Sequence, residues 1–364
     1  MLYYITLTQV CGLKCRYCMN EPNPRIMPIH FQVDLNILKK FLMMDPHRII
    51  CFYGGDPLYK IPLMEAIMDS IPAEHYIIQT NGIMLHRVKP SYIRRIDTLL
   101  VSIDGRPEVT DYYRGDGVYD KVLRNVGIAI ENGFQGDLVA RMAVSGASDI
   151  YREVTHLLNL EQPKFNHIHW QLDALWDYPP AQRYKDFKSW VYNIYNPGIY
   201  RLIRLWVKEM EDGRVLGIAP FKGIMWSMLT GENRYTLRCS SGLFSFAIGT
   251  DGRIMACPIA PEYKFNIIGD IFRSTPSELV GKVKIDEPCT SCKYYEYCGG
   301  RCLFANKTML WGREGFELVC DTVKFLIDSL KEVKGRIMEL IKEGIIKLPD
   351  IKYPPYLNSV EIIP

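Results

Sequence analysis

The stretch LYYITLTQVCGLKCRYC, residues 2–18, joins an apolar run to three closely spaced cysteines. The run over residues 2–8 predicts a β-strand, because it is short and rich in aromatic and β-branched residues. Cys11, Cys15 and Cys18 follow as Cys-x3-Cys-x2-Cys on the loop after this strand. Three thiols match neither a structural zinc site, which needs four ligands, nor a disulfide framework, which needs an even number of cysteines. The rest of the sequence has to account for the missing ligand.

Length and composition narrow the class of protein. The chain has 364 residues, of which 48% are hydrophobic, and this suits one large domain with a smaller one. The formal net charge is +3 and the densest basic stretch, HRVKPSYIRR, is short, so no nucleic-acid partner is indicated. We find neither a long apolar span nor a signal peptide, and we therefore expect no membrane partner and a cytoplasmic location.

Five further apolar runs repeat the pattern of the first strand. They predict strands over residues 48–53, 75–80, 98–103, 137–144 and 167–172. Helical patterns lie between them near residues 34–44, 61–70, 88–95, 119–132 and 149–160, and another follows at about 181–211. This βα repeat predicts an α/β fold with a parallel sheet covered by helices. Six units could form an open doubly wound sheet or a partial (β/α)6 barrel, and in both the ligands bind at the carboxyl ends of the strands.

The sequence changes character after residue 238. GLFSFAIGTDGRIMACPI, residues 242–259, predicts two strands around the hairpin turn Asp251-Gly252. A cysteine-dense segment runs to Cys320, and an amphipathic helix is expected from Asp321 until it fades near Gly344. We therefore divide the chain into a barrel over residues 1–215, a bridging linker over 216–238, a small cysteine-rich domain over 239–320, and a C-terminal helix and tail over 321–364.

The first cysteine set carries a family resemblance. Iron–sulfur clusters bind thiolates, and three cysteines would leave the fourth iron of a cubane cluster open to another ligand. The Cys-x3-Cys-x2-Cys loop, with Tyr17 before its last cysteine, resembles the radical S-adenosylmethionine (SAM) superfamily. The resemblance implies a [4Fe-4S] cluster at Cys11, Cys15 and Cys18 with SAM on the open iron. It also implies that an electron from the cluster breaks a carbon–sulfur bond of SAM, and that the resulting 5′-deoxyadenosyl radical takes hydrogen from a substrate.

Residues at the ends of the later strands extend the resemblance. The GGDP motif after the second strand resembles the family's GGEP motif, which meets the SAM amino group. Polar residues after the third and fourth strands, and Arg141 inside the apolar run LVARMAV, resemble positions that line the ribose, methionine and carboxylate of SAM. Ordinary turns, caps or an exposed strand edge are the alternative roles. The residues expected to bind SAM are Tyr17, Gly54, Gly55, Asp56, Pro57, Thr80, Asn81, Ser102, Asp104 and Arg141.

The second cysteine set resembles the SPASM domain, which adds auxiliary iron–sulfur clusters to radical SAM enzymes. Its local spacing, Cys-x2-Cys-x5-Cys-x3-Cys, also suits zinc, so one or two auxiliary [4Fe-4S] clusters compete here with zinc sites. The resemblance gives the distal cluster Cys289, Cys292, Cys298 and Cys320, and the nearer cluster Cys239, Cys257 and Cys302. The nearer cluster would then have an open iron or a ligand such as Glu232. The remaining thiol, Cys51, is expected in the core.

Together these patterns predict a radical SAM/SPASM enzyme that oxidises or cross-links a side chain of a peptide or protein. A reduced flavodoxin or ferredoxin would donate the electron. Formylglycine formation, as in sulfatase maturases, and dehydrogenation of a small molecule are alternatives. The first is disfavoured because Pro258 stands where the maturases have an aspartate base. An iron–sulfur electron-transfer protein without radical chemistry is the alternative from another class.

Overall fold

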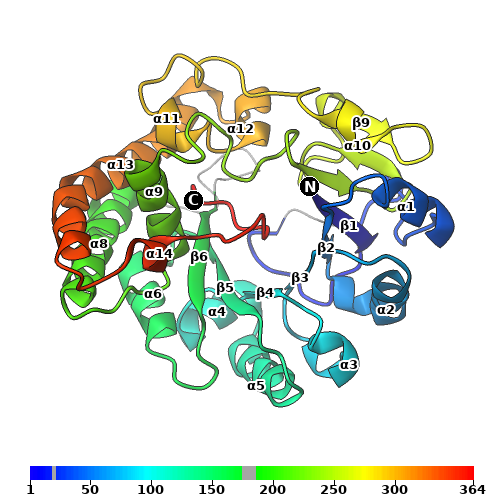
Figure 1. Ribbon diagram of the computed structural model, residues 1–364, viewed down its shortest axis with the longest axis horizontal. Helices are drawn as coiled ribbons and strands as arrows, with labels where there is room; N and C mark the ends of the chain where they lie inside the picture. Colours follow the sequence, from blue (N-terminus) through cyan, green and yellow to red (C-terminus); the bar gives the residue numbers. More distant parts are fainter. Residues whose placement is uncertain (19–21, 174–185) are drawn as a thin grey trace.

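The computed structural model describes residues 1–18, 22–173 and 186–364. Its centre is a set of parallel strands: β1 (Leu2–Thr8), β2 (Ile49–Gly54), β3 (His75–Thr80), β4 (Thr98–Ser102), β5 (Asp137–Val144) and β6 (His167–Leu172). Each strand pairs with the next one along the chain. A doubly wound sheet would reverse its strand order at a switch point. The sequential order therefore confirms the partial barrel, whose arc of strands is visible in Figure 1.

Helices cover the outside of this arc, as the βα repeat predicts. They are α1 (Leu35–Leu42), α2 (Ile61–Ser70), α3 (Pro90–Ile93), α4 (Pro107–Arg114), α5 (Val118–Glu131) and α6 (Ile150–Leu158), with short 3-10 turns at Pro57–Lys60 and Leu85–Arg87. Asp34 and Asp149 cap α1 and α6, because their carboxylates accept backbone N–H groups of the first helical turn. The helix expected at 181–211 begins outside the described residues. Its described part consists of α7 (Phe187–Trp190), a π-helical turn (Val191–Tyr195) and α8 (Asn196–Glu211).

The sheet continues past the barrel, which the predicted division of the chain does not anticipate. β7 (Ser245–Ile248) pairs in parallel with β1, and β8 (Arg253–Met255) and β9 (Ile267–Asp270) follow antiparallel. The β7–β8 turn at Asp251-Gly252 confirms the predicted hairpin. The segment expected to be a linker holds a largely buried helix, α9 (Ala219–Thr230). The cysteine-rich part therefore shares one nine-stranded sheet with the barrel.

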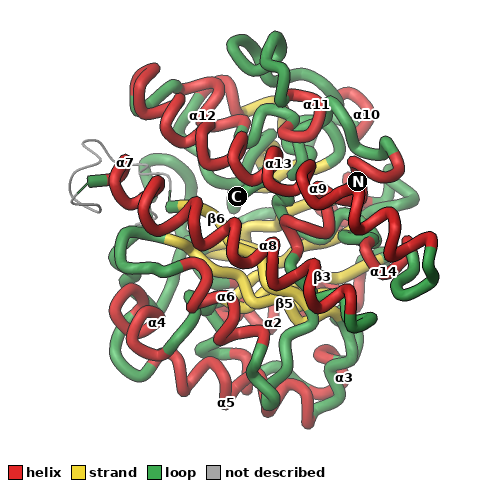
Figure 2. The backbone as a smooth tube through the Cα atoms, turned by 90° about the vertical axis from the view of Figure 1, so that its left-hand side faces the viewer, coloured by secondary structure: helices red, strands yellow, loops and turns green. Residues whose placement is uncertain are grey.

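Short helices and one long helix complete the chain. They are α10 (Pro276–Leu279), α11 (Tyr295–Cys298), α12 (Leu303–Thr308), α13 (Gly312–Lys342) and α14 (Leu348–Ile351). Because α13 begins before Asp321, Cys320 lies within the helix and not ahead of it. Figure 2 shows α13 above α8 on the same side of the sheet. Residues 352–364, here called the tail, turn back from α14 to the inside of the arc of strands, where Figure 1 draws them in red.

The described helices include none that is long and apolar enough to cross a membrane.

Candidate active site

The Gly54-Gly55 turn lies against the chain that enters the first cysteine loop. A Cβ atom on Gly54 would lie 2.2 Å from the Thr8 carbonyl oxygen, and one on Gly55 would lie 2.3 Å from that of Gln9. Gly54 also has a φ of +146°, which disfavours any side chain. The Gly55 N–H donates to the Thr8 oxygen over 2.9 Å. The two glycines thus let the end of β2 pack directly on the backbone that leads to the cysteines.

Asp56 organises this turn from inside the protein. Its carboxylate is fully buried and accepts hydrogen bonds from Thr80 Oγ1 (2.7 Å) and the Asn81 backbone N–H (2.7 Å). Burial raises the pKa of Asp56, and its hydrogen-bond donors lower it. The Asn81 side-chain amide in turn donates to Cys11 Sγ over 3.4 Å. The Asp56 carboxylate thus binds groups of the chain itself, and the contact of the GGDP motif with SAM stays a prediction.

Asp104 anchors the cysteine loop through Tyr17. Its carboxylate, which has no exposed surface, accepts the Tyr17 hydroxyl over 2.8 Å and the Ala143 N–H over 2.8 Å. The guanidinium of Arg114 forms two more bonds to it, of 2.8 and 2.7 Å. This carboxylate thus holds Tyr17, and the place of Asp104 in the SAM pocket stays a prediction. Sequence reasoning missed Arg114, whose only signal is a charge on the buried face of α4.

Two thiols of the first set, those of Cys11 and Cys15, are partly buried, and that of Cys18 is exposed. Burial raises the pKa of the Cys11 thiol, and it raises the pKa of Cys15 to about 11. The positive charge of Arg114 acts against burial and lowers the pKa of the Cys15 thiol. A bound cation offsets the cost of forming such a buried thiolate. The loop, its glycine support and its amide donor to Cys11 therefore fit the iron–sulfur cluster that the sequence predicts.

The four distal cysteines and Cys302 of the nearer set line one cavity of about 50 Å³. The cavity is lined by Cys289, Cys292, Cys298, Cys302 and Cys320, with aromatic and aliphatic neighbours. Burial raises the pKa of Cys289 to about 11 and that of Cys298 to about 12. In the part of the chain that the structure describes, no three His, Cys, Asp or Glu side chains are placed to hold a single metal ion. The thiols enclose a volume, which fits a cluster that is wider than one ion.

The nearer set also comes together. Burial raises the pKa of the Cys257 thiol, and the neighbouring Cys302 and Cys239 raise it further. The Cys257 backbone is fixed by Asn266, whose side chain bonds both its N–H and its carbonyl oxygen over 2.8 Å. Glu232 instead accepts a hydrogen bond from the Trp226 indole over 2.8 Å on the exposed end of α9. Cys51 is completely buried in the core, as predicted.

Two hollows meet at Tyr17. The central chamber, of about 510 Å³, is lined by Cys18, Gly54 and Gly55 on the barrel side and by Pro258 and Phe304 on the cysteine-rich side. The side chamber, of about 690 Å³, lies against the ends of β5 and β6 and is lined by residues that include Ser145 and Asp173. Both are at the carboxyl ends of the strands, where ligands of such sheets bind.

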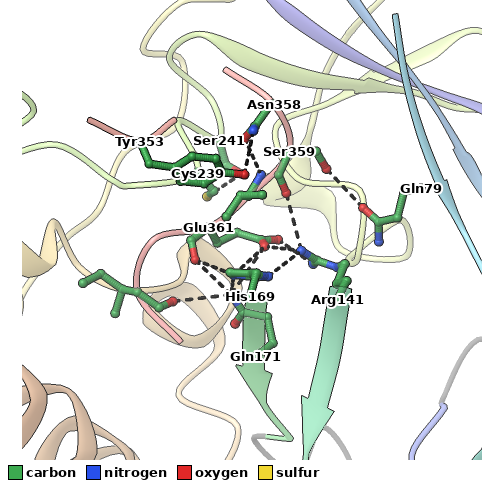
Figure 3. Close-up of polar contacts among 12 residues, drawn as sticks. Gln79, Arg141, His169, Gln171, Cys239, Ser241, Tyr353, Asn358, Ser359 and Glu361 are labelled. Carbon is green, nitrogen blue, oxygen red and sulfur yellow. Dashed lines mark hydrogen bonds and ion pairs between the residues drawn. The ribbon is translucent and has the colours of Figure 1, made fainter. Parts of the chain in front are cut away.

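Arg141 does not face either chamber freely. Its two terminal nitrogens bind the carboxylate of Glu361 in the tail over 2.7 and 3.0 Å, as Figure 3 shows. The expectation that this arginine meets the SAM carboxylate is corrected in this structure, because a carboxylate of the chain itself holds the guanidinium. Ser102 lies beside Arg141 as its register partner on β4 and is half-buried.

Comparison with known proteins agrees with this geometry. Residues 5–156 match the model of the Radical SAM superfamily. The chain contains a radical SAM domain. Residues 5–156 therefore form a domain of the kind that binds SAM and a [4Fe-4S] cluster.

Relatives extend over most of the chain. This chain is 24% identical to a cysteine-type anaerobic sulfatase-maturating enzyme of Clostridium novyi, over 80% of this chain and 84% of that protein. A similar enzyme of Clostridium perfringens is 21% identical over 80% of this chain and 85% of its own. The fold resembles that of native anSMEcpe with bound AdoMet, with a TM-score of 0.70 at 17% identity over 92% of this chain and 99% of that one. It also resembles Streptococcus suis SuiB bound to the precursor peptide SuiA, with a TM-score of 0.55 at 14% identity over 84% and 72%.

Proposed function

We propose that this enzyme abstracts hydrogen from a side chain of a peptide or protein in the central chamber, and that the product is oxidised or cross-linked. SAM and the cluster, when bound, supply the 5′-deoxyadenosyl radical that takes the hydrogen atom. Cys11, Cys15 and Cys18 would hold this cluster, and the cysteines of the second set would hold auxiliary clusters. A reduced flavodoxin or ferredoxin is the proposed electron donor.

The position of the central chamber carries the proposal. It lies between the first cysteine loop and the cysteine-rich part, so a side chain in it contacts Cys18 and the glycine turn on one side and Pro258 on the other. A volume of about 510 Å³ is within the range of ligand pockets and admits a segment of peptide. Relatives that act on sulfatases, and a fold relative solved with a precursor peptide, support a peptide as substrate.

Sulfatase maturation is the competing activity, favoured by the names of these relatives. Against it stands Pro258, which follows Cys257 where an aspartate base is expected for that reaction. The chamber lining does contain one carboxylate among the described residues, that of Glu262 on the same loop. A side chain there could accept a proton or hold a cationic group of the substrate. The two activities therefore differ in a measurable product and in their dependence on Glu262.

The test uses protein reconstituted anaerobically with iron and sulfide. We expect 5′-deoxyadenosine from SAM and a strong reductant with the wild type, and none with Cys18→Ala. Cys51→Ala is the matched control, because its thiol is completely buried and belongs to neither cysteine set, and it should retain activity. Formation of 5′-deoxyadenosine by Cys18→Ala would refute the assignment. Mass spectrometry of a cysteine-containing sulfatase peptide then separates an aldehyde, in which oxygen has replaced sulfur, from the loss of two hydrogen atoms in a cross-linked or dehydrogenated peptide, with Glu262→Gln run in parallel.

A further inference from the structure

The inner face of the barrel is polar where the strands begin. Barrel interiors are commonly filled by branched apolar side chains, and buried polar groups need hydrogen-bond partners. The tail supplies these partners. Tyr356 stacks on His75 with ring centres 3.6 Å apart and hydrogen-bonds Thr98. Tyr353 lies 4.0 Å from the ring of His167. The tail thus enters at the amino ends of the strands and closes this end of the barrel.

Farther along the strands, the tail continues to pair with inward-facing residues. Ser359 Oγ donates to Gln79 Oε1 over 3.1 Å. The carboxylate of Glu361 accepts hydrogen bonds from both terminal nitrogens of Arg141, over 2.7 and 3.0 Å. Figure 3 shows Arg141 and His169 pointing from β5 and β6 toward Glu361, which lies between them and the rest of the tail. Segments that are 220 residues apart in sequence therefore form one polar cluster.

The polar groups around Glu361 form hydrogen bonds with one another. His169 Nε2 lies 2.7 Å from the Glu361 carbonyl oxygen, so this nitrogen carries the hydrogen and donates it. His169 Nδ1 is then the acceptor for the Arg141 guanidinium, 3.3 Å away. Burial and the Arg141 charge lower the pKa of His169 to about 4, which agrees with a neutral ring. Among the residues that the structure describes, the carboxylate that pairs with Arg141 is thus that of Glu361, and both ring nitrogens of His169 are hydrogen-bonded within the cluster.

Packing holds the tail in place. Ser359, Val360, Ile362 and Ile363 are each at most 5% exposed. Ile362 lies so close to α9 that a Cβ atom on Gly223 would be 2.5 Å from its Cδ1 atom. A lid that opens and closes has few buried apolar contacts, whereas Val360, Ile362 and Ile363 belong to the main hydrophobic core.

The tail also reaches the neighbourhood of both cofactor regions. Tyr53 lines the central chamber. Burial raises the pKa of its hydroxyl, the charge of Arg141 lowers it, and the charge of Glu361 raises it. At its far end, the Pro364 carbonyl oxygen accepts a hydrogen bond from Arg301 Nε over 2.7 Å. Arg301 directly precedes Cys302 and lines the cysteine cavity. The tail therefore runs through the barrel from its closed end to the cysteine-rich part.

We infer that the tail is a permanent inner layer of the barrel and that Glu361 withholds Arg141 from SAM. The SAM carboxylate is then bound without this arginine. For SAM to recruit Arg141, Glu361 would have to give up its two shortest hydrogen bonds while its side chain is only 27% exposed, and separating a largely buried carboxylate from its cation is unfavourable. The inference rests on SAM binding by the radical SAM domain and is independent of which substrate the enzyme modifies.

Hydrogen exchange on the wild-type, cluster-containing protein tests the first part without any variant. We expect amides of residues 358–363 to be protected to the same degree with and without saturating SAM. Faster exchange of these amides on addition of SAM would overturn the inference, because it would show that SAM displaces the tail.

A paired substitution tests the second part. Arg141→Met combined with Glu361→Gln removes both charges and keeps the approximate side-chain shapes, and equilibrium dialysis then measures SAM affinity. With iron and sulfide content equal to the wild type, we expect the dissociation constant for SAM to stay within about threefold. A loss of tenfold or more, on the order of 1.4 kcal/mol, would show that Arg141 binds SAM and would overturn the inference. Arg95→Met with Asp69→Asn, an exposed pair of the same chemistry, is the matched control. Failure of the proposed peptide chemistry would change neither readout.

Discussion

Replacing Asp104 by Asn removes one buried negative charge and keeps the shape of the side chain. Asp104 is fully buried, and its ion pair with Arg114 has a separation of 2.7 Å with the arginine only 7% exposed. The substitution therefore leaves a buried guanidinium without its counterion. Breaking a buried pair in this way costs about 3–5 kcal/mol. The same carboxylate accepts the Tyr17 hydroxyl, so the first cysteine loop should loosen as well.

This free energy converts into a measurable thermal shift. For 364 residues, the unfolding entropy is about 0.8 kcal/mol per kelvin, so a loss of about 3–5 kcal/mol lowers the unfolding temperature by about 4–6 °C. Differential scanning calorimetry under anaerobic conditions measures the shift, at one scan rate because unfolding of a cluster-containing protein is often irreversible. Iron analysis on the same samples reports whether the loop still holds its cluster.

The control is Asp69→Asn, which breaks an aspartate–arginine pair on the surface, where Asp69 is 55% and Arg95 37% exposed. Solvent already screens this pair, so no resolvable shift is expected. The double variant Asp104→Asn with Arg114→Met removes both buried charges and should recover most of the lost stability. An Asp104→Asn protein that unfolds within about 1 °C of the wild type would refute the assignment of Asp104 as the anchor of the loop.

Three further outcomes follow from single residues. Gly54→Ala should sharply reduce iron content, because the new Cβ would lie 2.2 Å from a backbone oxygen, whereas Gly127→Ala, with open space around its Cβ, should not. Cys320→Ser should lower iron and sulfide by the content of one auxiliary cluster, and Cys51→Ser should leave both unchanged; equal loss in the two variants would contradict the assignment. The pKa of His169 is about 4 in the folded protein, against 6.5 in the unfolded chain. As the pH falls, the unfolded state therefore takes up the proton first. The free energy of unfolding consequently decreases between pH 6.5 and 4, by about 3 kcal/mol in all. His169→Gln should flatten the decline of the unfolding temperature between pH 7.5 and about 5.5, and an unchanged slope would contradict this assignment.

The parts of this molecule that the sequence predicts are those encoded locally. The strands at residues 2–8, 75–80, 137–144 and 167–172 occur as predicted, because each is a short apolar run bounded by turn residues. Sequence spacing likewise identifies the cysteine sets, since neighbouring thiols on one loop need no knowledge of the fold. The pairing of β7 with β1 has no such signal, because it joins segments more than 240 residues apart. The resulting continuous sheet was consequently not predicted.

Asp56, Asp104 and Arg141 show why a motif locates a site better than it assigns contacts. Each charge was found at a strand end or inside an apolar strand, and each indeed lies close to the first cysteine loop or the chambers. The partner of each charge, however, is set by tertiary packing: a turn for Asp56, an arginine of α4 for Asp104, and Glu361 of the tail for Arg141. Because a buried charge is stable only with a partner, a charged residue in an apolar run predicts that a partner exists. Which residue that partner is depends on tertiary packing, so the sequence around the charge does not identify it. In this protein all three partners come from the chain itself, so these charges hold the turn after β2, Tyr17 and the tail in place.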